Sequence, residues 1–223
     1  MSRKLGLVTI VWALIASLAF ALTVSATPAT AESHPAHAAR TNKAAFHDAM
    51  RKLWQDHVVW TRQFIVSAAT ESGTLADIGP TTDRLLANQT DIGNALKPFY
   101  GDVAGEQVTA LLRDHILTAA ELVAAAKAGD TSAADAASSA WYQNADDIAT
   151  ALNGLNPKHW PLDEMKAHMK DHLDLTLNEA VARLQGRYVD DIAAYDEIHV
   201  QILGMADMLS DGIIAQFPSQ FAG

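Results

Sequence analysis

Residues 111–116, Leu-Leu-Arg-Asp-His-Ile, contain a pattern that occurs three times in the chain. Each copy has an Asp-His pair followed by an aliphatic residue, with an apolar residue three positions before the histidine. The other copies are residues 53–58 and 168–173, and a small side chain follows each histidine by four positions. Apolar residues around each copy stand at three- and four-residue spacing, the period of one face of a helix. The pattern therefore predicts three equivalent helices, each with its histidine directed into the interior.

A second pattern predicts the partners of these helices. Asn88-x-x-Asp91-Ile92-x-x-Ala95-Leu96 recurs at residues 144–152, and a shorter form, Tyr188-x-x-Asp191-Ile192, follows later. Gly and Pro residues divide the chain into six helical segments, roughly 43–71, 77–97, 103–128, 131–153, 161–185 and 187–216. We expect an all-α bundle of about six helices in one domain, residues 43–217. Its three repeated helical hairpins would span about 43–100, 103–157 and 161–217.

The N-terminus has the layout of a cleaved secretory signal. Arg3-Lys4 precedes an apolar run, residues 5–24, and a small-residue site follows at Ala29-Thr30-Ala31. We expect a signal peptide at residues 1–31 and a flexible His/Ala/Pro leader at residues 32–42. The alternative is a retained anchor, since twenty apolar residues are long enough to span a bilayer. The protein is thus predicted to be secreted or held in the cell envelope, with a mature chain that does not span the membrane.

Composition excludes several classes of function. The chain has 223 residues, with 26 acidic against 16 basic side chains and a formal charge of −10. It has no Lys/Arg run outside its first residues, so we expect no nucleic-acid partner. It has no cysteine, which excludes disulfide frameworks, thiolate metal sites and cysteine nucleophiles. No phosphate-binding, dinucleotide-binding or nucleophilic-serine motif is found either.

The histidines of the repeated pattern are the leading candidates for a site. Equivalent positions on stacked hairpins can converge, and interior His and Asp side chains suit Zn, Fe, Mn or Cu. The alternative is that each is a neutral core histidine, hydrogen-bonded to Asn, Asp or backbone. Aspartates of the second pattern are candidates for carboxylate ligands or for hydrogen-bond partners of the histidines. The predicted metal-site residues are His57, His115, His172, Asp91, Asp147 and Asp191.

A second candidate site is confined to the last hairpin. His168 and His172 stand at positions i and i+4 of one helix face, the spacing that lets two imidazoles reach one metal. Asp196-x-x-His199 offers a similar face on the following helix. The Glu that follows the first histidine of a zinc-protease helix is missing here. The four side chains together form an alternative metal site, with no cofactor identified by spacing alone.

Four longer stretches give the chain a resemblance to known sequences. Leu53–Ala68, residues 91–101 (DIGNALKPFYG), residues 141–152 (WYQNADDIATAL) and Met205–Phe217 are similar to an uncharacterised family of bacterial, often exported, all-helical proteins. The resemblance implies a stand-alone helical domain and brings no established activity, cofactor or catalytic residue.

Three functions are compatible with these features. The leading prediction is an exported, non-enzymatic helical protein that binds a transition metal or small polar ligand through interior His and Asp residues. The second is a structural or interaction protein of the cell envelope whose polar core fixes the register of the helices. The third is a metal-dependent enzyme, which needs an open coordination position.

Overall fold

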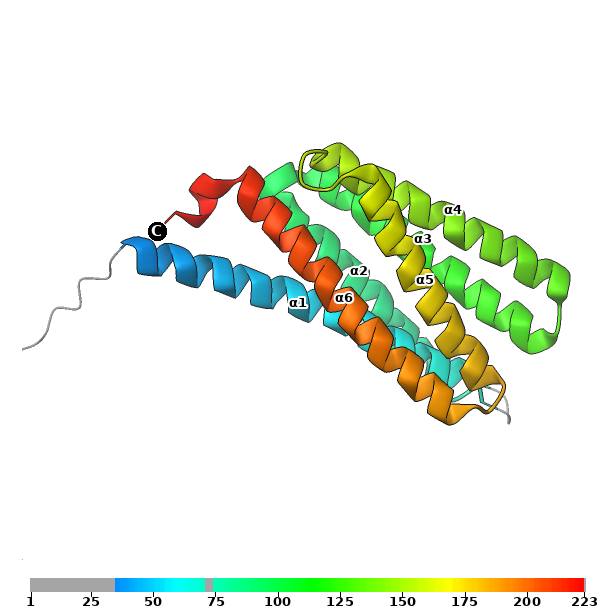
Figure 1. Ribbon diagram of the computed structural model, residues 1–223. Coiled ribbons are helices and arrows are strands. Elements are labelled where there is room, and N and C mark those ends of the chain that lie inside the picture. Colours follow the sequence, from blue (N-terminus) through cyan, green and yellow to red (C-terminus); the bar gives the residue numbers. More distant parts are fainter. Residues whose placement is uncertain (1–34, 71–73, 223) are drawn as a thin grey trace, which may run out of the picture. The chain divides into compact units, whose positions relative to one another are not determined.

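A computed structural model describes residues 35–70 and 74–222 of the chain, which form six α-helices and one short 3-10 helix (Figure 1). The predicted all-α bundle is confirmed. Contacts divide the chain into two units, Met1–Glu32 and Ser33–Gly223, and everything described lies in the second. The predicted signal peptide and cleavage site lie outside the described residues. The elements are α1 (Pro35–Ala68), α2 (Ile78–Tyr100), α3 (Asp102–Ala128), α4 (Thr131–Leu155), α5 (Leu162–Leu184), α6 (Tyr188–Gln216) and η1 (Pro218–Phe221).

The helices end close to the predicted breakers. Gly129 ends α3 in the left-handed conformation with φ 71°, and the Asp130 side chain accepts a hydrogen bond from the Ala133 N–H to begin α4. Helix α2 continues through Pro98 to Tyr100, beyond the predicted end at residue 97. Proline in the last turn removes only one backbone hydrogen bond, which explains the extension. Helix α1 begins at Pro35, inside the segment predicted to be a leader, because its Ala-rich sequence also favours a helix.

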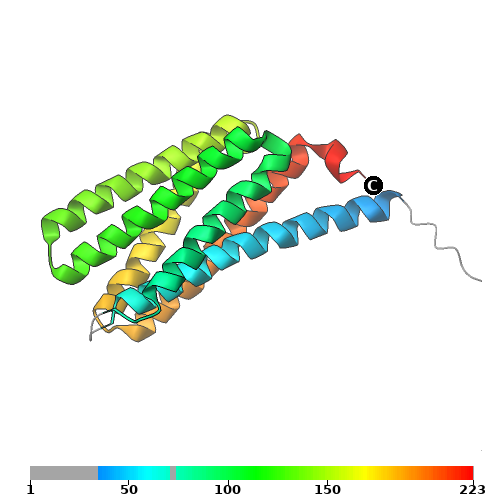
Figure 2. The same cartoon turned by 180° about the vertical axis from the view of Figure 1, so that it is seen from behind.

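Each helix packs against the next one along the chain, and α6 returns to α1, so the six helices form a closed ring (Figures 1 and 2). Helix α1 also contacts α3 and α5 across the ring. Two glycines bring α2 and α3 unusually close together. A Cβ on Gly93 would lie 1.9 Å from Thr109 Oγ1, and one on Gly105 would lie 2.7 Å from the Gly93 carbonyl oxygen.

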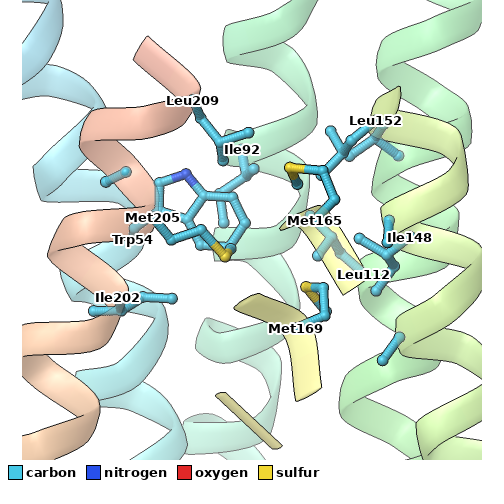
Figure 3. Packing of buried hydrophobic residues seen from close by; sticks show 14 of the residues in the cluster. Trp54, Ile92, Leu112, Ile148, Leu152, Met165, Met169, Ile202, Met205 and Leu209 are labelled. Atoms are coloured by element: carbon cyan, nitrogen blue, oxygen red, sulfur yellow. The ribbon is translucent and has the colours of Figure 1, made fainter. Parts of the chain in front are cut away.

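The main core receives side chains from all six helices (Figure 3). On the odd-numbered helices, large residues precede each histidine by three positions and are 2–4 % exposed. These residues are Trp54, Leu112 and Met169. Figure 3 shows them among the side chains of Ile92, Ile148, Ile202, Met205 and Leu209. The bundle is therefore filled by large side chains on the N-terminal side of the three histidines.

Helix α6 is long and apolar enough to meet the criteria of a membrane span, with a mean hydropathy of 1.2 over its most apolar window. In the structure, 44 % of that window is buried in the bundle. Its apolar side chains at positions 198, 202, 205, 209 and 213 are at most 2 % exposed. Such a core helix needs no lipid contact to bury its apolar face. The prediction that the mature chain does not span a membrane stays a prediction.

Candidate histidine site

The three histidines of the repeated pattern lie in the interior of the bundle, as their position on the apolar face predicts. His57 on α1 and His115 on α3 are 3 % exposed, and His172 on α5 is 4 % exposed. The ring centroids of His57 and His172 are 5.6 Å apart. His115 is near enough to both for the charges of the three rings to affect one another. The odd-numbered helices therefore bring these imidazoles into one region.

Amide side chains on the even-numbered helices hold two of the rings. His115 Nδ1 lies 3.0 Å from Asn144 Oδ1, and Asn144 Nδ2 donates to the Leu111 carbonyl at 3.1 Å. His172 Nδ1 lies 3.2 Å from Gln201 Oε1, and Gln201 Nε2 donates to the His168 carbonyl at 3.0 Å. In both pairs the amide NH₂ group donates to the backbone carbonyl, so the amide oxygen faces the imidazole ring. That oxygen can only accept, and Nδ1 therefore carries the proton in both imidazoles.

The first hairpin departs from this arrangement. Asn88 occupies the position of Asn144 and donates to the Leu53 carbonyl at 3.0 Å. Asn88 Oδ1 accepts a hydrogen bond from Gln89 Nε2 at 3.2 Å, and not from His57. A side-chain hydrogen bond with Gln89 opposes the lowering of the His57 pKa, although its geometry is looser than that of the other two pairs. His57 Nδ1 and Gln89 Oε1 are both buried, and their contact is the loosest of the three histidine–amide contacts.

Burial sets the protonation state of all three rings. Loss of hydration lowers the pKa of His115 to about 3 and that of His172 to about 4. The pKa of His57 falls well below its usual value, through burial first and repulsion from His172 and His115 next. The histidines are thus neutral at pH 7. With Nδ1 protonated, Nε2 of His115 and His172 carries a free lone pair and has no hydrogen bond among residues 35–70 and 74–222.

The spacing of His57 and His172 is close to that of two imidazoles sharing one ion. With metal–nitrogen distances of about 2.0–2.1 Å and a tetrahedral angle, two ring centroids are about 5 Å apart. The observed 5.6 Å needs only a small adjustment. Among the described residues, however, no group of three or more His, Asp or Glu side chains is arranged to hold a metal ion. The spacing of the His57 and His172 rings is thus compatible with a shared ion, and His115 lies near both.

The predicted carboxylates do not lie beside the histidines. Asp91 is 51 % exposed and lies 3.7 Å from Arg84, and Asp147 is exposed and accepts from Gln143 at 3.0 Å. Both directly precede an inward isoleucine, and adjacent helix positions point about 100° apart, which places these carboxylates outside. Asp191 is fully buried, but Arg62 and Arg183 take its oxygens at 2.8 and 3.2 Å. Amides, not aspartates, serve as the partners of the histidines.

The alternative site in the last hairpin is not assembled around His172. His168 and His199 are partly exposed, and Asp196 is exposed. The His199 ring lies 6.3 Å from that of Tyr195, and no ring contact joins His168 or His199 to His172 in the described residues. The i and i+4 spacing is present, but the side chains of α6 do not complete a site with it.

The sequence predicts the third copy of the second pattern at Asp191-Ile192, but the structure places the equivalent polar residue elsewhere. Ile192 is 54 % exposed, whereas Ile92 and Ile148 are 2 % and 1 % exposed. The structure places Gln201 opposite His172, as it places Asn144 opposite His115. Both amides follow their histidines by 29 positions, so an equal interval was the sequence signal that could have found Gln201.

No known family model matches the sequence, and no curated protein and no solved structure matches it either. The resemblance to a bacterial helical family stays a prediction. The function of the site has to be argued from its own geometry.

Proposed function

We propose that this chain is an exported, non-enzymatic helical protein that binds one transition-metal ion through interior histidines. His57 and His172 are the first ligands, and His115 or a small exogenous ligand completes the coordination. The observation that carries the proposal is the state of the rings: they are buried and neutral, and two are fixed through Nδ1 so that Nε2 is free. Metal-binding histidines are commonly oriented in this way, by a hydrogen bond to the other ring nitrogen.

The loosely paired atoms of the first hairpin support a ligand at the same place. A buried donor or acceptor with a poorly formed hydrogen bond is less stable than one that is fully paired, and His57 Nδ1 and Gln89 Oε1 are in that state. A metal-bound water or another small polar ligand would supply better partners for them. This is the observation that favours ligand binding over a purely structural polar core.

A structural role in the cell envelope is the second candidate function. Asn144 joins α4 to the His115 ring and to the α3 backbone, and Gln201 does the same for α6 and α5. Such buried hydrogen bonds are satisfied in only one register of two helices, which makes them suited to fixing register. Under this proposal the histidines need no ligand.

Metal analysis separates the two proposals. The protein is purified without a histidine tag, and its metal content, the visible spectrum of its Co²⁺ form and its melting temperature with added Zn²⁺ are measured. We expect one ion per chain and a higher melting temperature with metal, because the ion binds only the folded state. Binding should be lost in His57→Ala and His172→Ala and kept in His159→Ala, a control in the loop between α4 and α5.

Double substitutions test whether the histidines act as a set. If the two histidines share one site, the first substitution already removes it. The double variant should therefore lose less stability than the sum of the losses in His57→Ala and His172→Ala. Additive losses together with no bound metal would favour the structural role. Loss of binding in His168→Ala and His199→Ala, but not in His57→Ala, would move the site to the last hairpin. Export is tested separately, by N-terminal sequencing of the secreted protein, which should begin at Glu32.

A further inference from the structure

One side of the N-terminal half of α6 is apolar and faces away from the bundle (the orange part of α6 in Figure 1). Val189 is 82 % exposed, Val200 is 73 % exposed and Ile192 is 54 % exposed. Their spacing in the sequence places them on the same side of an α-helix, and the exposed Ala193 and Gly204 lie on that side too. These five residues form the α6 outer face.

An apolar outer face sets α6 apart from an ordinary amphipathic helix, whose solvent side is polar. The most apolar window of α6 has a mean hydropathy of 1.2, and only 44 % of it is buried in the bundle. Exposed apolar residues that stand singly, such as Val103 at the start of α3, need no explanation. On α6 several lie together on one side. Such a group is typical of a surface that contacts a partner.

The charges of α6 indicate the chemistry of that partner. Helix α6 contains six acidic side chains and no Lys or Arg. Three of the acids already pair with arginines, namely Asp190, Asp191 and Asp207. Asp196 and Glu197 are exposed and have no ion pair among residues 35–70 and 74–222. Asp196 stands between Ile192 and Val200, four positions from each, so this unpaired charge belongs to the apolar surface itself.

A second copy of this chain fits the α6 outer face poorly. In a two-fold contact through α6, the same patch of both copies meets, so that acidic side chains face acidic side chains. No Lys or Arg of α6 is present to compensate Asp196 and Glu197 in such a contact, and facing like charges is unfavourable. An anionic lipid surface is disfavoured by the same charges. The complementary surface is apolar at its centre and basic beside it.

We propose that the α6 outer face binds an amphipathic helix of a partner protein, with Lys or Arg beside its apolar stripe. Apolar side chains at helical spacing would cover the valines and the isoleucine of α6, as in other cases of helix recognition. The basic side chains would pair with Asp196 and Glu197 and set the orientation of the partner. Gly204 has open space around it, which leaves room for the partner helix to approach closely.

Titration with three synthetic peptides of about 18 residues, five helical turns, tests the proposal. The first is an amphipathic helix of Leu and Lys, the second has Glu in place of Lys, and the third has the composition of the first without an apolar side. We expect saturable binding of one Leu/Lys helix per chain and at least about tenfold weaker binding of the other two. Equal binding of the first and third peptides would show general charge attraction and would overturn the proposal, as would no saturable binding of the first.

Substitutions on α6 locate the binding. The double variant Ile192→Ser with Val200→Ser should weaken binding of the Leu/Lys helix by about tenfold or more. Val103→Ser is the matched control, because Val103 is 83 % exposed on α3, and it should bind as the unaltered chain does. Asp196→Lys with Glu197→Lys should reverse the preference, so that the Leu/Glu helix binds more tightly than the Leu/Lys helix. Unchanged affinity in the folded serine variant, or an unchanged preference in the folded lysine variant, would overturn the proposal.

Sedimentation and vesicle binding test the other occupants of the α6 outer face. The unaltered chain should sediment as a monomer and should not bind vesicles of anionic phospholipid through this face. A dimer that dissociates in the double serine variant would assign the face to a second copy of the chain. Vesicle binding that is lost in the same variant would assign it to a membrane, and either result would overturn the proposal.

Discussion

Lowering the pH from 7 to 5 is expected to destabilise the metal-free protein, because its core histidines are neutral when folded and become protonated on unfolding. Burial lowers the pKa of His172 to about 4 and that of His115 to about 3, and the pKa of His57 is lowered well below its usual value. In the unfolded chain each has a pKa of about 6.5. Between these values the unfolded state binds more protons. Stability is therefore complete above about pH 6.5 and decreases as the pH falls toward 4.

The size of the effect follows from the pKa differences. At pH 5 an unfolded histidine is almost fully protonated and the folded one is not, which costs about 2 kcal/mol for each residue. His115 and His172 together cost about 4 kcal/mol, and His57 adds to the loss in the same direction. Glu179 acts in the opposite direction, since burial raises its pKa to about 7 in spite of the nearby Arg62. Its protonation between pH 7 and 5 favours the folded state by about 2 kcal/mol. The net loss from His115, His172 and Glu179 is about 2 kcal/mol, and His57 increases it, which is a large part of the stability of an ordinary domain.

Urea denaturation followed by far-UV circular dichroism at pH 7, 6 and 5, with chelator present, measures this loss. Replacing His115 by Asn removes one titrating group and should reduce the loss between pH 7 and 5 by about 2 kcal/mol. His159→Asn, at a partly exposed loop position, is the control and should leave the loss unchanged. An unfolding free energy that does not vary over this pH range would refute the argument that the three rings are buried and neutral.

Three further predictions concern stability at pH 7, each measured by urea denaturation. Asp191→Asn should cost about 3–5 kcal/mol, because Arg183 loses its buried carboxylate partner and Arg62 keeps only Glu179. The exposed neighbour in Asp190→Asn should change stability by less than about 1 kcal/mol. Gly212→Ala should cost about 1–3 kcal/mol, because the added Cβ would lie 2.1 Å from Trp160 Nε1. Gly204 has open space around it, so Gly204→Ala should instead stabilise α6 by about 0.5–1 kcal/mol. Asn144→Ala should cost about 1–3 kcal/mol by leaving His115 Nδ1 buried without a partner, and an unchanged midpoint would contradict the hydrogen bond.

The helices could be predicted from the sequence because their signals are local. Glycine at position 129, followed by aspartate, ends one helix and begins the next through backbone conformation and one side-chain bond. The end of α2 could not be placed in the same way. Proline at position 98 disfavours helix interiors, but in a last turn that contacts the packed core its cost is small. Boundaries that depend on packing are not encoded in the residues beside them.

The burial of the histidines was also predictable, since each lies on an apolar face with the period of a helix. Their partners were not, because pairing depends on which residue of a neighbouring helix lies opposite. An aspartate that directly precedes an inward isoleucine points to solvent, as Asp91 and Asp147 do. Asp191 is buried for an unrelated reason, its contacts with two arginines. The sequence could identify the residue types of the site but not the contacts between helices.

The first hairpin is where the proposed ligand site and a purely structural polar core differ in what they require. A polar core that serves only to align helices is most stable when every pair is satisfied, as His115 with Asn144 and His172 with Gln201 are. In the first hairpin, Gln89 turns its NH₂ group to the Leu85 carbonyl and leaves its own oxygen only loosely paired with His57 Nδ1. His57 is also the ring that lies 5.6 Å from His172. The loosest histidine–amide pair and the 5.6 Å ring spacing thus occur at the same histidine, so His57 is the residue whose substitution best separates the two proposals.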